Sequence, residues 1–77
     1  MHLTILSPEG AVFEGDVQQV TLPGRLGRVQ ILRNHAPFTS LLQEGTITYG
    51  DAQREYTLAI KKGWVEVRDN RVTVFLT

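Results

Sequence analysis

The sequence contains no cysteine, so neither a disulfide nor a thiolate metal site can hold the chain together. Eight Lys and Arg balance eight Asp and Glu, and a net charge of zero argues against nucleic acid as the main partner. No apolar run approaches the roughly 18 residues that span a bilayer, and no signal-peptide pattern opens the chain. We therefore expect a protein that is soluble or is held at a membrane only through another protein.

Helical periodicity is also absent, and short apolar alternations recur between turn signals instead. Strands of about five residues, separated by Gly, Pro, Asn and Asp, are typical of a small all-β sandwich or barrel. Two facing sheets are the simplest way to bury one side of each strand. The sequence therefore predicts one all-β domain over residues 1–77.

The C-terminal hairpin can be placed with its register. Asp69-Asn70 suits the positive φ angles of a type I′ turn, and this turn pairs Val67 with Val72 and Trp64 with Phe75. One face of the hairpin is then entirely valine, and we expect it to belong to the core.

A second hairpin is predicted over residues 46–60. A four-residue loop sets Ile47 opposite Tyr56 and Thr46 opposite Thr57, which matches like with like. Because a slip of one residue would turn every side chain to the other face, we expect this register.

Residues 27–37, GRVQILRNHAP, form a short strand that ends in a polar, cationic turn. Asn34 tolerates the positive φ that such a turn needs, and Ala36 is pushed into extended geometry by Pro37. A strand that feeds a cationic loop is typical of a surface presented to a partner. A solvated turn in which His35 bonds its own backbone is the simpler alternative.

The residues that could carry chemistry are few and scattered. Ser7 and Ser40 lie near no histidine in the sequence, and His2 and His35 show no paired spacing with carboxylates. No glycine-rich phosphate loop leads from a strand into a helix. The sequence thus predicts no catalytic residue, no metal site and no cofactor, and it favours a binding or structural module.

Three segments together resemble the epsilon-subunit family of the bacterial rotary ATP synthase, called delta in mitochondria. They are LTILSPEGAVFEGDVQQVTLPG, with the opening strand and a Phe-x-Gly step, GRVQILRNHAPFTSLLQEGTITY, with His-Ala-Pro, and LAIKKGWVEVRDNRVTVF, with Val-Glu-Val and Val-Thr-Val. The resemblance covers nearly the whole chain, and the combination is more specific than any single segment.

The resemblance implies the family's N-terminal domain, a flattened β-sandwich of about ten short, mostly antiparallel strands. It implies a non-catalytic subunit of the central stalk that docks against the gamma subunit and touches the loops of the c-subunit ring. Such a subunit couples ring rotation, driven by protons or sodium ions, to ATP synthesis. It would bind no nucleotide directly and would lie at the cytoplasmic face of the bacterial inner membrane only through the complex.

The resemblance also implies contact residues. The candidate contacts to the c ring lie along one predicted edge: Arg28, Gln30, Leu32, Arg33, Asn34 and His35. Trp64 and Phe75 are the candidate contacts to gamma, because aromatic residues anchor interfaces. The alternatives are a solvated edge that discourages strand pairing for the two arginines, a core position for Leu32, and a core pair for the two aromatics.

The chain departs from the family pattern in three places. Arg28 stands where the family often has an acid, so a ring loop that meets it would need a complementary acid. Gln30 replaces a usual glycine, and Arg33-Asn34 replaces Pro-Gly. No C-terminal helical hairpin follows, so we expect neither an inhibitory arm nor a nucleotide site in this chain.

Other functions fit the composition less well. A free-standing β-sandwich module that binds a peptide along a free strand edge is the main alternative. An oligonucleotide-binding barrel would need basic and aromatic residues interleaved on one strand face, and Arg54 beside Tyr56 is the one such pair. A small hydrolase would need a polar pocket that this composition gives no reason to expect.

Overall fold

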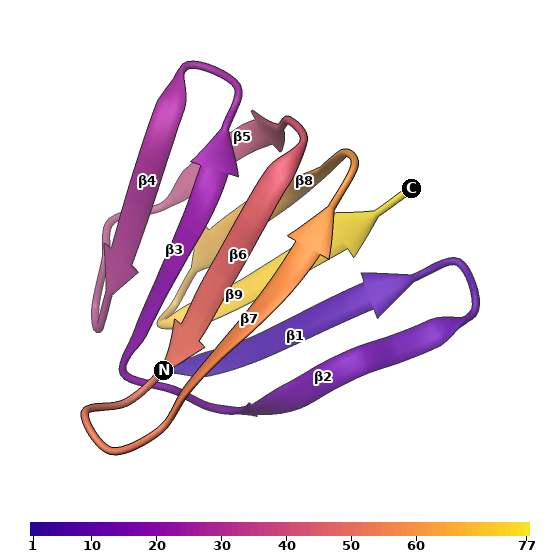
Figure 1. Cartoon of the computed structure of the whole chain (residues 1–77). Helices are drawn as coiled ribbons and strands as arrows, with labels where there is room; N and C mark the ends of the chain where they lie inside the picture. The colour runs from indigo at the N-terminus through magenta and orange to yellow at the C-terminus, as the bar shows by residue number, and fades with distance from the viewer.

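The computed structural model describes residues 1–77 and contains nine strands and no helix (Figure 1). From the N-terminus the strands are β1 (His2–Ser7), β2 (Gly10–Asp16), β3 (Gln19–Gly24), β4 (Gly27–Leu32), β5 (Phe38–Leu42), β6 (Gly45–Gly50), β7 (Glu55–Ile60), β8 (Gly63–Arg68) and β9 (Arg71–Leu76). All neighbouring strands are antiparallel except β1 and β9. The all-β prediction is confirmed, with nine strands in place of about ten. There is thus no helix that could cross a membrane.

The strands form two layers that belong to one curled sheet. The order β4-β3-β6-β7 makes one layer, and the order β5-β8-β9-β1-β2 makes the other (Figure 1). The layers are joined where Gly24 at the end of β3 pairs with Leu42 at the end of β5. The molecule measures 26 × 22 × 18 Å along its principal axes, so the flattened sandwich is confirmed.

One long hairpin supplies strands to both layers. Leu42 of β5 pairs with Gly63 of β8, and Gly45 of β6 pairs with Ile60 of β7. Both arms advance by three residues between these pairs, so the register runs unbroken from one layer into the other. The hairpin therefore folds in half across the short segments that join β5 to β6 and β7 to β8. Strands that switch sheets at such a bend make the corner of a sandwich.

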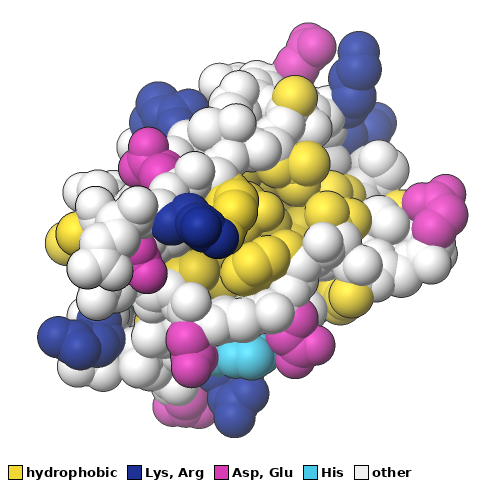
Figure 2. Space-filling view, turned by 60° about the horizontal axis from the view of Figure 1, so that its bottom comes forward, with side chains coloured by type: hydrophobic (Ala, Val, Ile, Leu, Met, Phe, Trp, Pro, Cys, Tyr) yellow, Lys and Arg dark blue, Asp and Glu magenta, His cyan; other side chains and the backbone are white.

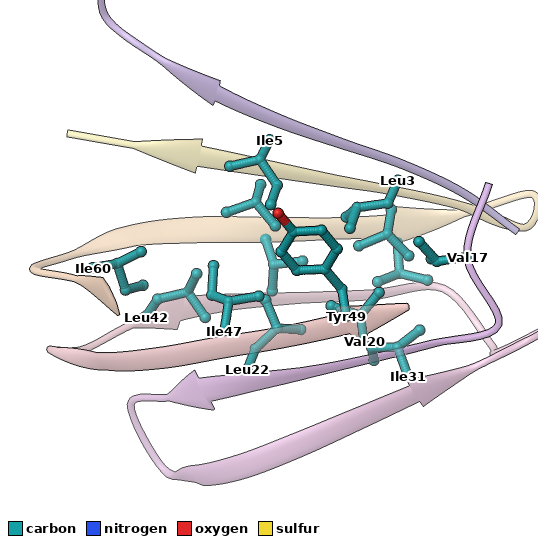
Figure 3. Packing of buried hydrophobic residues seen from close by; sticks show 14 residues of the cluster. Leu3, Ile5, Val17, Val20, Leu22, Ile31, Leu42, Ile47, Tyr49 and Ile60 are labelled. Atoms are coloured by element: carbon teal, nitrogen blue, oxygen red, sulfur yellow. The ribbon is translucent and has the colours of Figure 1, made fainter. Parts of the chain in front are cut away.

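The core fills the space between the layers and contains no polar residue (Figure 3). It consists of fourteen buried apolar residues: Leu3, Ile5, Val17, Val20, Leu22, Ile31, Leu42, Ile47, Tyr49, Ile60, Val65, Val67, Val72 and Val74. The valine face predicted for the C-terminal hairpin is among them, so this prediction is confirmed. Asp69 and Asn70 have φ angles of 53° and 59°, and all the pairs predicted from this turn are present.

The register predicted for the hairpin of residues 46–60 is wrong by two positions. Ile47 pairs with Leu58, and Thr57 pairs with Thr48. Because the slip is an even number of residues, every side chain keeps its predicted face.

The loop of this hairpin explains the difference. Asp51 accepts two backbone hydrogen bonds at its Oδ1, from the amides of Gln53 and Arg54, each at 2.9 Å. The backbone of Asp51 also donates to the carbonyl oxygen of Arg54 at 2.9 Å. Because of this turn at Asp51, the centre of the hairpin loop lies one residue later in the sequence than in the register predicted from pairing similar side chains.

Replacing Gly63 with alanine should destabilise the fold strongly. A Cβ at Gly63 would lie 2.1 Å from the backbone oxygen of Phe75, and a strand backbone cannot move aside as a side chain can. We expect a loss of about 2–3 kcal/mol in the free energy of unfolding, measured with chemical denaturant. Gly15→Ala is the matched control, because its Cβ meets only the ring of Phe13, at 3.2 Å. Equal losses in the two variants would contradict this account of the bend.

Candidate functional site

Strand β4 turns alternate side chains toward solvent. Arg28, Gln30 and Leu32 are exposed, whereas Ile31 is fully buried. The strand pairs only with β3, so it is an edge strand, as the position of these residues in the sequence suggests. Leu32 is 51% exposed, which excludes the alternative that it is a core residue.

The six candidate ring contacts extend along β4 and into the loop that follows it. Strand β4 runs along the length of its layer, so Arg28 lies at one end and the turn at Arg33 lies at the other (Figure 1). Arg28 donates from Nη1 to the backbone oxygen of Thr46, at 3.3 Å, beside the fold of the long hairpin. The candidate contacts therefore form a row that runs from the β3–β4 turn to the β4–β5 loop.

The β4–β5 loop is fastened to the opposite layer. Asn34 has a φ of 63°, as predicted, and its backbone N–H donates to Oδ1 of Asn70 at 2.8 Å. Asn70 is the second residue of the β8–β9 turn. The hydrogen bond between the two asparagines therefore holds the β4–β5 loop against the β8–β9 turn.

His35 holds this loop in shape. Its backbone N–H donates to the carbonyl oxygen of Leu32 at 3.1 Å, and its Nδ1 lies 2.7 Å from the carbonyl oxygen of Ala36. Since a carbonyl can only accept, Nδ1 carries the hydrogen in this contact. The imidazole also meets the ring of Phe38 edge-on, with centroids 5.9 Å apart. The histidine therefore bonds the backbone of its own turn, and β5 begins just after the turn, at Phe38.

Trp64 and Phe75 stack on the outer face of the five-stranded layer. Their ring centroids are 4.7 Å apart and their planes differ by 16°. The neighbouring valines face the core, so the alternative of a core aromatic pair is excluded. Leu41 pairs with Trp64, and Leu6 pairs with Phe75. These four residues form an apolar stripe across β5, β8, β9 and β1.

A second apolar surface lies where β2 and β7 approach each other. The ring of Phe13 lies 4.7 Å from that of Tyr49 and 6.4 Å from that of Tyr56, which is 42% exposed. Figure 2 shows apolar side chains gathered in a hollow on this side of the molecule. Burial, with a smaller contribution from Tyr56, raises the pKa of Tyr49, so its hydroxyl remains neutral at physiological pH.

Strand pairing brings carboxylates to His2 that are distant in the sequence. Its Nε2 lies 3.0 Å from Glu14 and its Nδ1 lies 3.5 Å from Asp16. The sequence spacing gave no sign of this group, because β1 and β2 create it by pairing. The hydroxyls of Ser7 and Ser40 bond backbone oxygens and contact neither histidine. Neither of these two serines therefore has a histidine beside it to act as a base.

One exposed residue escaped the sequence reasoning. Leu26 is 100% exposed at the tip of the β3–β4 turn, beside Arg25. The sequence does contain an indication of this exposure. In the run PGRLGR a single apolar residue is flanked by Arg and Gly in a turn, where no strand can bury it.

Comparisons with known proteins agree over the whole chain. The family model described as ATP synthase, Delta/Epsilon chain, beta-sandwich domain matches residues 1–77. An ATP synthase epsilon chain of Sulfurovum sp. is 42% identical over 74 residues, which are 95% of this chain and 58% of the relative. The epsilon chain of Desulfitobacterium hafniense is 42% identical over 72 residues, which are 94% of this chain and 54% of the relative. The chain thus spans somewhat more than half the length of these relatives.

Solved structures share the fold. One is a chain in the central stalk and c-ring structure of the Tetrahymena thermophila mitochondrial ATP synthase, with a TM-score of 0.85 and 17% identity. It is matched over 100% of this chain and 63% of its own length. Another, from the Euglena gracilis mitochondrial ATP synthase, has a TM-score of 0.88 and 18% identity over 96% of this chain and 48% of its own length. At these identities the likeness concerns the fold.

Replacing Asn70 with glycine should free the β4–β5 loop without breaking the β8–β9 turn. Glycine adopts positive φ readily, so the turn persists, but the acceptor for the Asn34 amide is lost. We expect faster hydrogen exchange at the Asn34 amide, measured by NMR, and a stability change below about 1 kcal/mol. Asn70→Asp keeps the acceptor and serves as the control. Equal exchange rates in the two variants would show that the contact does not hold the loop.

Proposed function

The chain belongs to the delta/epsilon chain family of ATP synthase, whose β-sandwich domain it matches over residues 1–77, and we propose that it is the docking domain of an epsilon subunit. In this role it binds the gamma subunit and the loops of the c ring, and it transmits rotation between them without catalysing a reaction itself. The match of the whole chain to the family carries this proposal. The domain would lie at the cytoplasmic face of the bacterial inner membrane, held there by the complex.

The apolar stripe is the surface that suits gamma. Trp64 and Phe75 present a stacked, half-buried aromatic pair, and Leu41 extends it while remaining 54% exposed. Interfaces draw most of their affinity from a few such aromatic anchors at the centre of an apolar patch. The indole N–H of Trp64 donates to Glu66 at 3.2 Å, so the ring is held in place before a partner arrives.

The opposite face is the one that suits the polar loops of the ring. Along β4 it presents Arg28, Gln30 and Leu32, and the loop that follows adds Arg33, Asn34 and His35. Contacts of this kind are polar and partly cationic, so they should weaken as the salt concentration rises.

A free-standing interaction module is the second candidate. Strands β2, β4 and β7 each pair with one neighbour only, so three strand edges are open to an added peptide strand. A module of this kind would bind extended peptides and would have no affinity for gamma.

Calorimetry with the gamma subunit of the same organism tests the proposal. We expect one-to-one binding at physiological salt. Trp64→Ala and Phe75→Ala should each raise the Kd about 30-fold, equivalent to ~2 kcal/mol. Thr73→Ala removes a half-buried polar side chain between them in sequence and should change the Kd little.

The contrary results are distinct. A folded wild-type chain that does not bind gamma would overturn the stalk assignment and favour the free-standing module. Binding that survives the loss of both aromatic rings would retain the stalk assignment and move the gamma contact away from the apolar stripe.

A further inference from the structure

One side of the sandwich is bounded by two strands that do not pair with each other. Strand β7 ends the four-stranded layer, β2 ends the five-stranded layer, and each pairs with one neighbour only. The rings of Phe13, Tyr49 and Tyr56 lie between these strands, and Tyr56 is 42% exposed. Apolar side chains are therefore visible in the hollow of Figure 2.

The backbone of β7 is also open along this side. A hollow of about 320 Å³ lies between residues 59–62 and the β1–β2 turn at residues 7–9. None of the eight backbone hydrogen bonds outside the strand ladders involves residues 55–60. The N–H and C=O groups that β7 directs away from β6 therefore have no partner within the chain.

The other open edges carry features that discourage pairing, whereas β7 has none of them. Strand β2 bulges where its register with β1 shifts, and its last residues include Glu14 and Asp16. Strand β4 carries Arg28 and is followed by Arg33. By contrast, β7 keeps an unbroken register with β6, and its residues 56–60 include no charge, proline or glycine. An edge strand of this kind is the one that accepts an added strand.

The sequence of β7 is complementary to itself. In an antiparallel pair that is centred on Leu58, Tyr56 lies opposite Ile60 of the second copy, and Glu55 lies opposite Lys61 of the second copy. Because strand side chains alternate, the first pair lies on the inner face with Leu58 and the second lies on the outer face. The inner row is thus wholly apolar, and the outer row ends in opposite charges.

Neighbouring registers match less well. Moving the centre one residue toward the N-terminus sets Arg54 opposite Ile60, and moving it one residue toward the C-terminus sets Tyr56 opposite Lys62. Either shift brings a charge into the apolar row, so the pattern selects the register that is centred on Leu58.

Both charged residues of this register are held only by exposed contacts within the chain. Lys61 lies 3.6 Å from Glu44, with side chains that are 86% and 75% exposed. Glu55 accepts a hydrogen bond from Gln19 at 3.1 Å, also at the surface. Exposed contacts of this kind contribute little to stability, so a second copy can replace them without disturbing the fold.

We propose that two copies of this chain dimerise in solution by antiparallel pairing of their β7 strands about a two-fold axis at Leu58, with Glu55 of each copy against Lys61 of the other. The two four-stranded layers then join into one continuous sheet. The apolar stripe lies on the other layer and β4 lies at the far edge, so both remain open in the dimer. Dimerisation through β7 therefore leaves the proposed binding of gamma unaffected, and either can fail without the other.

Sedimentation equilibrium of the purified chain, over an about 100-fold range of concentration, tests the dimer. We expect the mass to rise from that of one chain to that of two. Glu55→Lys sets two lysines against each other at both ends of the paired strands, and Lys61→Glu sets two glutamates there. Each variant should raise the dimer Kd about 10- to 100-fold. An equimolar mixture of the two variants restores opposite charges at both ends and should recover the dimer.

Two further variants separate the edge from net charge. Arg33→Glu changes the net charge as Lys61→Glu does, but it lies in the β4–β5 loop and should dimerise like the wild type. Thr57→Lys places a charge in the middle of the open edge and should raise the dimer Kd about tenfold. The substituted residues are all exposed, so circular dichroism should show an unchanged fold.

Three results would overturn the proposal. The chain could remain monomeric over the whole range, or its dimer could be indifferent to the charges at Glu55 and Lys61. A mixture of the two charge variants that stays monomeric would show that these residues do not meet. If the β7 amides gain protection from hydrogen exchange only when gamma is added, the edge pairs with gamma and not with a second copy.

Discussion

The architecture depends on one close approach between two strand backbones. At Gly63 the chain passes so near the carbonyl oxygen of Phe75 that no Cβ fits between them. This approach lets β8 pair with β9 directly after the bend, while the register with Leu42 continues unbroken. The folded hairpin then supplies β6 and β7 to one layer and β5 and β8 to the other. A core of fourteen apolar residues can close between the layers because one hairpin has already joined them.

The strand register also determines which side chains lie on the outer surface of each layer. On the four-stranded layer a polar row crosses the strands, made by Gln30, Thr21, Thr48 and Thr57. On the five-stranded layer the corresponding face carries the apolar stripe. Since strand side chains alternate, a slip of one residue in either layer would send these rows into the core. The constraint that builds the core therefore also decides which face is apolar and which is polar.

Sequence reasoning succeeded where structure is local. The turn at Asp69-Asn70 fixes its own hairpin, so the pairs around it followed from two residues. It failed where the strand register depends on how a loop folds. The loop at Asp51 shifted a register that side-chain matching alone could not fix. The candidate ring contacts lie within eight positions of the sequence, and the extended strand β4 spreads them over a distance of up to roughly 16 Å between Arg28 and Arg33.

The docking role that we propose for this domain requires a fold that passes force without deforming. This chain has 47 backbone–backbone hydrogen bonds, and its β4–β5 loop is tied across the layers by Asn34 and Asn70. Trp64 belongs to the apolar stripe and also lines a hollow that Arg25 and Lys62 border. Leu41 and Trp64 of the stripe lie on the antiparallel pair of β5 and β8, so a load applied to the stripe would fall on the backbone hydrogen bonds between these two strands.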